Sequence, residues 1–463
     1  MDVAIVGRPE SLFEQGIRLS PAAQHLRTAT HEGLVSLDAT GQVIPALAER
    51  WIVTDDGLSY IFRIRERDWP DGEAVNAGDV RSAINDLLRR LEGTSLGLDL
   101  AKVTEVRAMT DRIVELRLTS PMPEFLRLLA QPELGLVKDA NGAGPMMASR
   151  EEDLARLSIL PPGERGLPQR EGWEDSTRPL LVQAMPVRTA IKAFSAGEVD
   201  LLLNGGLAGL PDVEIGPLSR GTIQVDPALG LFGLVVRSDS GVLSEPATRE
   251  ALSMAIERAA LLDAFGIGGW QPRGWIVPAD LFPNSGMATG RWSSLSLADR
   301  RGVASRRIAA WRAENDGREP VVRIGLPAGS GSDLLFRRIA QDWAQIGVRA
   351  VKVAPGVGAE LELRDRLARY SSPRWYLNQF NCELEIGLCS EEADSLVRQS
   401  LSVTDAAEKE RLLADAHSIL VQNEVFIPLG APVRWSLVRG AIEEYQPNQW
   451  GLHPLFPLAG PTI

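Results

Sequence analysis

One stretch of the chain, residues 369–382, concentrates side chains that could bind a small molecule. It holds four aromatic residues and three neutral amides, and the candidates for solute contacts among them are Trp375, Tyr376, Asn378, Gln379 and Phe380. Aromatic rings stack on flat or apolar groups, and amide side chains exchange hydrogen bonds without carrying charge. No acidic residue follows Arg369 until Glu383. The pattern favours contacts with a flat or uncharged part of a solute; the alternative is that these aromatic residues form the core of a domain.

Four residues elsewhere are further candidates for solute contacts: His25, Glu133, Trp435 and Trp450. Glu133 could pair with a cation on a solute, or it could be a solvated loop charge. His25 and His31 are six residues apart, so they do not share a helical face as metal ligands at i and i+4 would. No third ligand accompanies them, and we expect no metal site. For His25 the alternative to a solute contact is a surface or half-buried histidine.

The chain lacks the sequence patterns of common catalytic sites. It contains no Gly-x-Ser-x-Gly, no His-Glu-x-x-His and no Cys-x-x-Cys. The loop Gly325–Ser332 is rich in glycine and serine, but it has neither the lysine of a phosphate-binding loop nor the spacing of a dinucleotide-binding turn. We therefore expect a protein that is not an enzyme and uses no cofactor.

Composition narrows the class of protein further. The 463 residues carry a formal net charge of −12, which argues against a nucleic-acid partner because phosphate binding requires clustered basic residues. No apolar run is long enough to span a membrane. Residues 1–8 lack the basic and apolar regions of a secretory signal peptide. Either the protein is not exported or its leader has been removed.

The most regular pattern in the chain lies at Ala46–Val80. Leu58, Tyr60, Phe62 and Ile64 alternate with other residues as in a half-buried strand, after a tight turn at Asp56-Gly57. Asn76 is suited to cap a following helix whose apolar residues recur at helical spacing. This segment is expected to be a hairpin followed by a helix.

The same segment resembles the signature of a known family. Ala-Leu-Ala-x-x-Trp is followed by Asp-Asp-Gly-Leu-x-Tyr-x-Phe-x-Ile-Arg, then by Trp-x-Asp-Gly and Ala-x-Asp-Val. The order and spacing are similar to those of the extracytoplasmic solute-binding proteins of the oligopeptide, dipeptide and nickel type (family 5), which serve ABC importers. Weaker similarity extends over most of the chain, except at Ser158–Arg178, which departs from the family pattern.

The resemblance implies an α/β protein with the two-lobed periplasmic-binding-protein (Venus flytrap) fold and an extra α+β domain. By the order of the matching motifs, lobe one comprises residues 1–33, 141–240 and 433–463. The extra domain covers 34–140, and lobe two covers 241–432. The two connections between lobes are expected near residues 236–241 and 428–433.

The resemblance also implies the function. The protein is expected to capture a small solute between its lobes and to deliver it to the permease subunits of an ABC importer. It should act as an extracytoplasmic monomer whose signal peptide has been removed, because Val3–Val6 resembles the first core strand of the mature family fold. Two alternatives stay open: a soluble sensor or regulator with the same fold, and a peptide binder with a non-standard pocket.

Two expectations depend on this family comparison. Peptide-binding relatives carry Trp-x-x-Asp-Tyr-x-Asp-Pro, in which one aspartate pairs with the peptide's ammonium group, and the stretch starting at Arg369 has no such acid. We therefore predict a solute other than a peptide held by its free N-terminus, for example a sugar, an opine or another small metabolite. In an oxidising compartment Cys382 and Cys389 could form a disulfide across a short loop; two free thiols are the alternative.

Overall fold

The computed structural model divides into two compact units, each built on its own sheet. Unit 1 consists of Met1–Gly206, Val213–Ala228 and Val433–Ile463, and unit 2 of Leu207–Asp212 and Leu229–Pro432. The residues that the structure describes are 1–138, 141–213, 222–283, 291–440 and 442–460.

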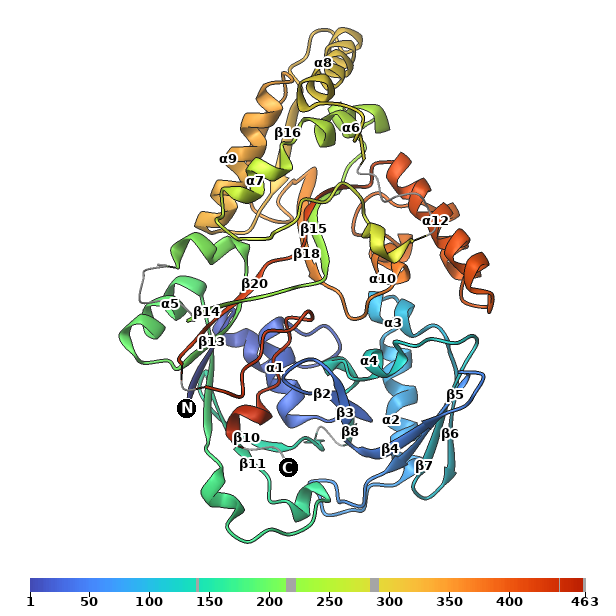
Figure 1. Cartoon of the computed structure of the whole chain (residues 1–463), viewed down its shortest axis with the longest axis vertical. Helices are drawn as coiled ribbons and strands as arrows, with labels where there is room; N and C mark the ends of the chain where they lie inside the picture. The colour runs from blue at the N-terminus through green and yellow to red at the C-terminus, as the bar shows by residue number, and fades with distance from the viewer. Residues whose placement is uncertain (139–140, 214–221, 284–290, 441, 461–463) are drawn as a thin grey trace. The chain divides into compact units, whose positions relative to one another are not determined.

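Unit 1 is organised around a seven-stranded mixed sheet with the order β10-β11-β12-β1-β13-β20-β14 (Figure 1). Its strands are β1 (Asp2–Val6), β10 (Met146–Glu151), β11 (Leu154–Ile159), β12 (Leu180–Met185), β13 (Leu201–Gly205), β14 (Ile223–Asp226) and β20 (Arg434–Val438). Strand β1 lies parallel between β12 and β13, and helix α5 (Val187–Ala196) connects those two strands. Apolar residues such as Ile5, Val182 and Leu201 are fully buried because side chains of the central strands are covered on both faces.

The segment with the family signature contributes β4 and β5 to a second sheet within unit 1, which has the order β4-β5-β7-β6. Its strands are β4 (Ala48–Val53), β5 (Ser59–Ile64), β6 (Val103–Thr110) and β7 (Ile113–Leu118). The expected strand at residues 58–64 is confirmed as β5, and Tyr60, Phe62 and Ile64 are buried. The Asn76 side chain accepts a hydrogen bond from the Asp79 amide at 3.0 Å, which confirms it as the cap of the helix α2.

Short elements complete unit 1. Helix α2 packs against β6 and β7 (Figure 1). The helices are α1 (Pro21–Thr30), α2 (Ala77–Arg90), α3 (Ser95–Leu100) and α4 (Phe125–Leu129), and the two short hairpins pair β2 (Val35–Leu37) with β3 (Val43–Pro45) and β8 (Val137–Lys138) with β9 (Asn141–Gly142).

Unit 2 contains a five-stranded sheet with the order β17-β16-β18-β15-β19. Its strands are β15 (Gly230–Val236), β16 (Val321–Gly325), β17 (Arg349–Val353), β18 (Leu361–Leu367) and β19 (Phe426–Gly430). Its helices are α6 (Pro246–Ala255), α7 (Arg258–Asp263), α8 (Leu297–Glu314), α9 (Ser330–Ala344), α10 (Pro373–Asn378), α11 (Glu391–Gln399) and α12 (Ala406–Gln422). Strand β16, helix α9 and strand β17 follow one another along the chain, and β16 and β17 pair in parallel.

The boundary near residue 240 that we expected from the sequence needs correction. Strand β15, which we assigned to lobe one, belongs to the sheet of unit 2 because its backbone pairs with β18 on one side and β19 on the other. Apart from the short segment Leu207–Asp212, the chain therefore leaves unit 1 after Ala228 and returns at Val433. The segment 34–140 forms its own sheet, and it groups with unit 1 as one compact body.

Candidate functional site

The aromatic stretch of unit 2 is buried. Trp375, Tyr376 and Phe380 are each 1% exposed, and the rings of Trp375 and Tyr376 meet edge to face with centroids 4.9 Å apart. Phe380 packs on Phe426 of β19, with ring centroids 5.3 Å apart. The amide of Gln379 donates a hydrogen bond to the Trp375 carbonyl at 3.2 Å. Phe380 and Gln379 thus make contacts typical of a domain core.

Tyr376 differs because its neighbours are polar. Burial raises the pKa of Tyr376, and the Arg273 guanidinium, which hydrogen-bonds its hydroxyl, acts in the opposite direction. Arg273 also donates to the Gly230 carbonyl at 3.0 Å. The hydroxyl of Tyr376 is therefore held beside the positively charged guanidinium of Arg273.

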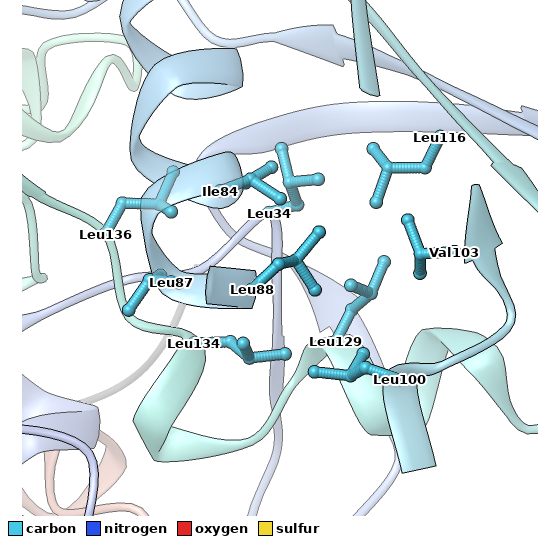
Figure 2. A pocket seen from close by; sticks show the side chains of 10 residues that line it. All are labelled: Leu34, Ile84, Leu87, Leu88, Leu100, Val103, Leu116, Leu129, Leu134 and Leu136. Carbon is cyan, nitrogen blue, oxygen red and sulfur yellow. The ribbon is translucent and has the colours of Figure 1, made fainter. Parts of the chain in front are cut away.

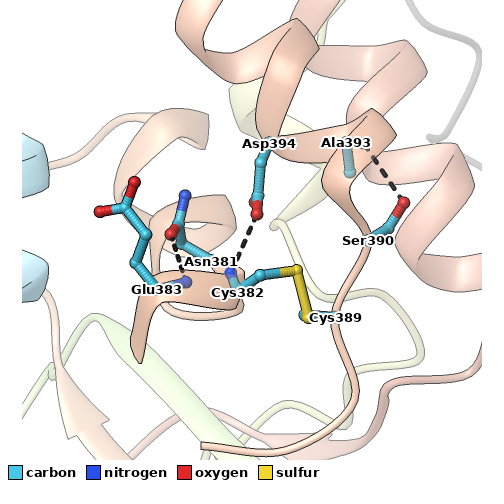
Figure 3. Close-up of a disulfide and its surroundings, with 7 residues drawn as sticks. All are labelled: Asn381, Cys382, Glu383, Cys389, Ser390, Ala393 and Asp394. Carbon is cyan, nitrogen blue, oxygen red and sulfur yellow. Dashed lines mark hydrogen bonds between the residues drawn. A yellow bond between two sulfur atoms is a disulfide. The ribbon is translucent and has the colours of Figure 1, made fainter. Parts of the chain in front are cut away.

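The two cysteines lie directly after this stretch and form a disulfide (Figure 3). Their Cα atoms are 5.3 Å apart, within the range that a disulfide spans. The loop between them is tied to β15, since the Leu388 amide donates to the Val236 carbonyl at 2.8 Å. The Asp394 carboxylate accepts a hydrogen bond from the Cys382 amide at 2.9 Å, and burial raises its pKa. The disulfide and Asp394 together hold the loop that follows α10 against helix α11.

Removing this disulfide should destabilise unit 2 moderately. We expect the double substitution Cys382→Ser and Cys389→Ser to lower the free energy of unfolding by about 2–3 kcal/mol, because the reduced unfolded chain regains the entropy of a short loop. Urea denaturation of the variant and of the oxidised wild-type protein measures the difference. Equal stabilities of the oxidised and the dithiothreitol-reduced wild-type protein would contradict this expectation.

The other predicted residues lie in unit 1, and all are buried. Glu133 is 4% exposed, and its carboxylate accepts a hydrogen bond from the side-chain amide of Gln24 at 3.0 Å. Glu133 is therefore not a solvated loop charge, which was one of the two possibilities considered from the sequence. Its second carboxylate oxygen, Oε2, has no hydrogen-bond partner among the described residues. Trp435 donates to the Gly206 carbonyl at 2.9 Å, and the guanidinium of Arg127 lies 4.2 Å above the Trp450 ring.

His25 belongs to a buried polar network that joins three distant parts of unit 1. Its Nε2 lies 3.5 Å from the His453 amide, and His453 Nε2 lies 3.1 Å from the Asp226 carboxylate. The other carboxylate oxygen of Asp226 accepts the Asn448 amide hydrogen at 3.0 Å. Burial, with a smaller contribution from His453, lowers the pKa of His25 to about 4 although the Pro21 carbonyl opposes the shift. His25 is therefore neutral at pH 7, and the reading as a surface histidine is wrong.

Sequence reasoning missed the Asp226 and His453 pair. These residues are 227 positions apart and lie in segments without a motif, so no local signal relates them. The network links α1, the end of β14 and the C-terminal segment, and Asp226 lies two residues before the chain leaves unit 1.

Two of the cavities in unit 1 differ in what they can hold. A cavity of about 1420 Å³ is lined mainly by residues of the loop 66–76, of β10 and of the segment 160–169, with His31 and Trp69 among them. The second, of about 20 Å³, is lined only by aliphatic side chains, among them Leu34, Ile84 of α2 and Leu116 of β7 (Figure 2). A space of that size accepts about one water molecule, and its walls offer no polar group, so it is a packing gap and not a solute site.

Comparison with known proteins agrees with this architecture. Residues 42–154 match the family model described as bacterial extracellular solute-binding proteins, family 5 middle. Di/tripeptide-binding protein 1 of Pseudomonas aeruginosa is 22% identical, over 90% of this chain and 86% of that protein. The complex of Haemophilus influenzae OppA with RPPGFSPFR superposes with a TM-score of 0.80 at 17% identity, covering 98% of both chains. The A. tumefaciens protein AgaA in complex with agropinic acid gives 0.71 at 17% identity, covering 95% of this chain and 93% of AgaA.

These findings define the class of protein. The solved structures support the two-lobed periplasmic-binding-protein fold, and the match of residues 42–154 together with the relatives supports a similarity to family 5 of the bacterial extracellular solute-binding proteins. The family is extracytoplasmic, binds solutes for ABC permeases and is not a family of enzymes.

Two kinds of feature are absent from the residues that the structure describes. No helix among them combines the length and apolar character needed to cross a bilayer. No three or more His, Cys, Asp or Glu side chains in that part of the chain are grouped as metal ligands.

Proposed function

We propose that this chain is the substrate-binding component of an ABC importer and that its solute is not a peptide held by a free N-terminus. The observation that carries the proposal is the charge of the stretch 369–382. Relatives that bind peptides by the ammonium group need a carboxylate, because an unpaired ammonium in a closed site costs several kcal/mol. The matching stretch of this chain, which starts at Arg369, contains no such aspartate, and no acid follows before Glu383.

Two further observations support the proposal. Arg374, Tyr376 and Asn378, which follow Arg369, are buried polar residues without negative charge at neutral pH. Among proteins of this fold, AgaA was solved with agropinic acid, so the fold accommodates solutes that are not peptides. The relatives also include di/tripeptide-binding proteins, which makes peptides the alternative that an experiment must test.

Reversible binding is tested with the purified protein. Native mass spectrometry is expected to show a retained solute of low mass, and adding that solute should raise the melting temperature by mass action without its being consumed. A mixed pool of di- to pentapeptides should leave the melting temperature unchanged. Tight calorimetric binding of peptides from that pool that disappears on N-acetylation would refute the proposal about the solute, and conversion of the solute would refute the proposal of a binding protein.

A further inference from the structure

The cavity of about 1420 Å³ in unit 1 meets the free edge of the seven-stranded sheet. Strand β10 is the last strand at one end of that sheet, next to β11 (Figure 1). Met146 and Met147 both line the cavity, although side chains of successive strand residues leave opposite faces. The cavity therefore extends around the edge of β10. All residues described as lining it belong to unit 1, so the cavity does not depend on the closure of two lobes.

The backbone along this edge has unused hydrogen-bonding groups. The Leu160 amide donates to the Pro145 carbonyl at 2.9 Å, and hydrogen-bonded pairs alternate along an antiparallel ladder. The amides and carbonyls of Met146, Ala148 and Arg150 therefore point away from β11. Among the residues that the structure describes, none forms a hydrogen bond with these outward backbone groups. The same three residues line the cavity.

This edge lacks the features that usually keep free strands from pairing. Natural proteins protect such edges with a bulge, a proline, charged side chains or a covering element. β10 keeps one register with β11 over its whole length, and residues 146–149 contain neither a charge nor a proline. Met147 is 62% exposed. An added strand would satisfy the outward backbone groups and cover this apolar side chain.

The walls of the cavity favour a single extended segment as the added strand. The loop 66–76 and the segment 160–169 supply most of the remaining lining. A second copy of this chain would bring a whole sheet with its edge strand, for which walls formed by two loops leave little room. The segment 160–169 lies within Ser158–Arg178, which departs from the family pattern, so the family resemblance does not imply this cavity.

The arginines that line the cavity already interact with other groups of unit 1. Arg67 is ion-paired with Glu32 at 3.2 Å, and Arg112 with Glu66 at 3.2 Å. The guanidinium of Arg150 lies 4.1 Å from the centroid of a phenylalanine ring. These cations therefore do not require an anionic partner.

Three carboxylates on the same walls are available for a basic partner. Asp68, Asp111 and Glu164 are exposed, and none of them is ion-paired with a residue that the structure describes. Asp68 and Glu164 act on Arg67 only beyond ion-pair distance. Lysine or arginine side chains of an added strand would complement these carboxylates. Because side chains alternate along a strand, its basic residues can leave the face opposite to that of Arg150.

We propose that β10 binds an extended, basic segment of a partner protein, which adds to the sheet as a further strand inside this cavity. The segment matches the six-residue length of β10. The proposal goes beyond the proposed function, because it concerns neither the solute nor its delivery. The pool of di- to pentapeptides that tests the solute is shorter than β10 and does not probe this edge.

The probe is an acetylated and amidated peptide of alternating lysine and valine residues with the length of β10, which imitates an internal segment. At millimolar concentration it should slow amide hydrogen exchange at Ala148 and Arg150, whose amides point outward. The amide of Ser149 points toward β11 and should change less. Two control peptides, one with glutamate in place of lysine and one with N-methylated backbone amides, should protect neither position.

Two variants assign the effect to the strand edge. Ala148→Pro removes an outward N–H and leaves the ladder with β11, since edge strands accept proline where the N–H faces away from the sheet. It should weaken binding of the basic peptide about tenfold, the scale of one lost hydrogen bond together with a steric block. Met147→Lys places a positive charge on the edge without changing the backbone and should also weaken binding. It decides the question if Ala148→Pro does not fold.

A third variant tests the charge of the cavity. Glu164→Gln should weaken binding about two- to fivefold, the scale of an exposed charge pair. Asp415→Asn is its control, because it removes an exposed carboxylate from α12 of unit 2. It should leave binding of the basic peptide unchanged.

Three results would overturn the proposal. The first is unchanged exchange at Ala148 and Arg150 in the presence of the basic peptide, and the second is equal protection by the N-methylated peptide. The third is a dimer that protects these amides without any peptide and that Ala148→Pro dissociates, since a second copy would then occupy the edge. None of these results concerns the retained solute, so the proposed function depends on its own test.

Discussion

Replacing Arg291 with glutamine should destabilise unit 2 by about 3–5 kcal/mol, the cost typical of leaving a buried charge without its partner. Arg291 is ion-paired with Glu424, which is 1% exposed and sits in the left-handed backbone region with φ 46°. The second oxygen of Glu424 has no hydrogen-bond partner among the described residues. Arg291 also lies 4.4 Å from the Trp292 ring centroid, so the substitution removes packing as well as charge.

Denaturant unfolding at pH 7.5 measures this effect, and Arg307→Gln is its matched control. Arg307 pairs with the partly exposed Glu250 at 2.7 Å, and such pairs contribute at most about 1 kcal/mol. Burial raises the pKa of Glu424, so in Arg291→Gln the carboxyl can take up a proton more readily. The loss of stability should therefore be smaller at pH 5 than at pH 7.5. Equal effects of the two arginine variants would show that the buried pair is not important for stability.

The second large effect is a loss of folding stability at acidic pH. Burial, together with the nearby Arg291 charge, lowers the pKa of His417 to about 4 from an ordinary value of 6.5. Between these two values the unfolded chain binds a proton that the folded protein does not, so stability is lost as the pH falls from 6.5 to 4. One such histidine contributes a loss of up to about 3 kcal/mol. His25 behaves in the same way, with a folded pKa of about 4.

His417→Phe isolates this contribution. The imidazole lies 5.9 Å from the Trp275 ring and 5.7 Å from the Phe282 ring, so an aromatic side chain fits its surroundings. The variant loses the interaction of His417 Nε2 with the Val277 amide at 3.5 Å and should be slightly less stable at pH 7.5. The difference in unfolding free energy between pH 7.5 and 4.5 should shrink relative to the wild-type protein. The same pH dependence in both proteins would contradict a neutral buried His417.

Local patterns in the sequence determined most of the individual elements. The alternation over β5 and the Asn76 cap of α2 each depend on residues a few positions apart, and such patterns reflect backbone geometry and burial of one face. The family signature added the two-lobed fold, which no local pattern defines. It also identified the place where a carboxylate is missing, because that comparison requires only the order of residues.

Only the tertiary structure decided to which sheet a strand belongs, which residues are neighbours in space and how far each side chain is buried. β15 is apolar along its whole length, so its pattern is compatible with either sheet, and only its pairing with β18 and β19 assigns it to unit 2. Burial of Glu133 and the contact of Asp226 with His453 depend on segments more than one hundred residues away.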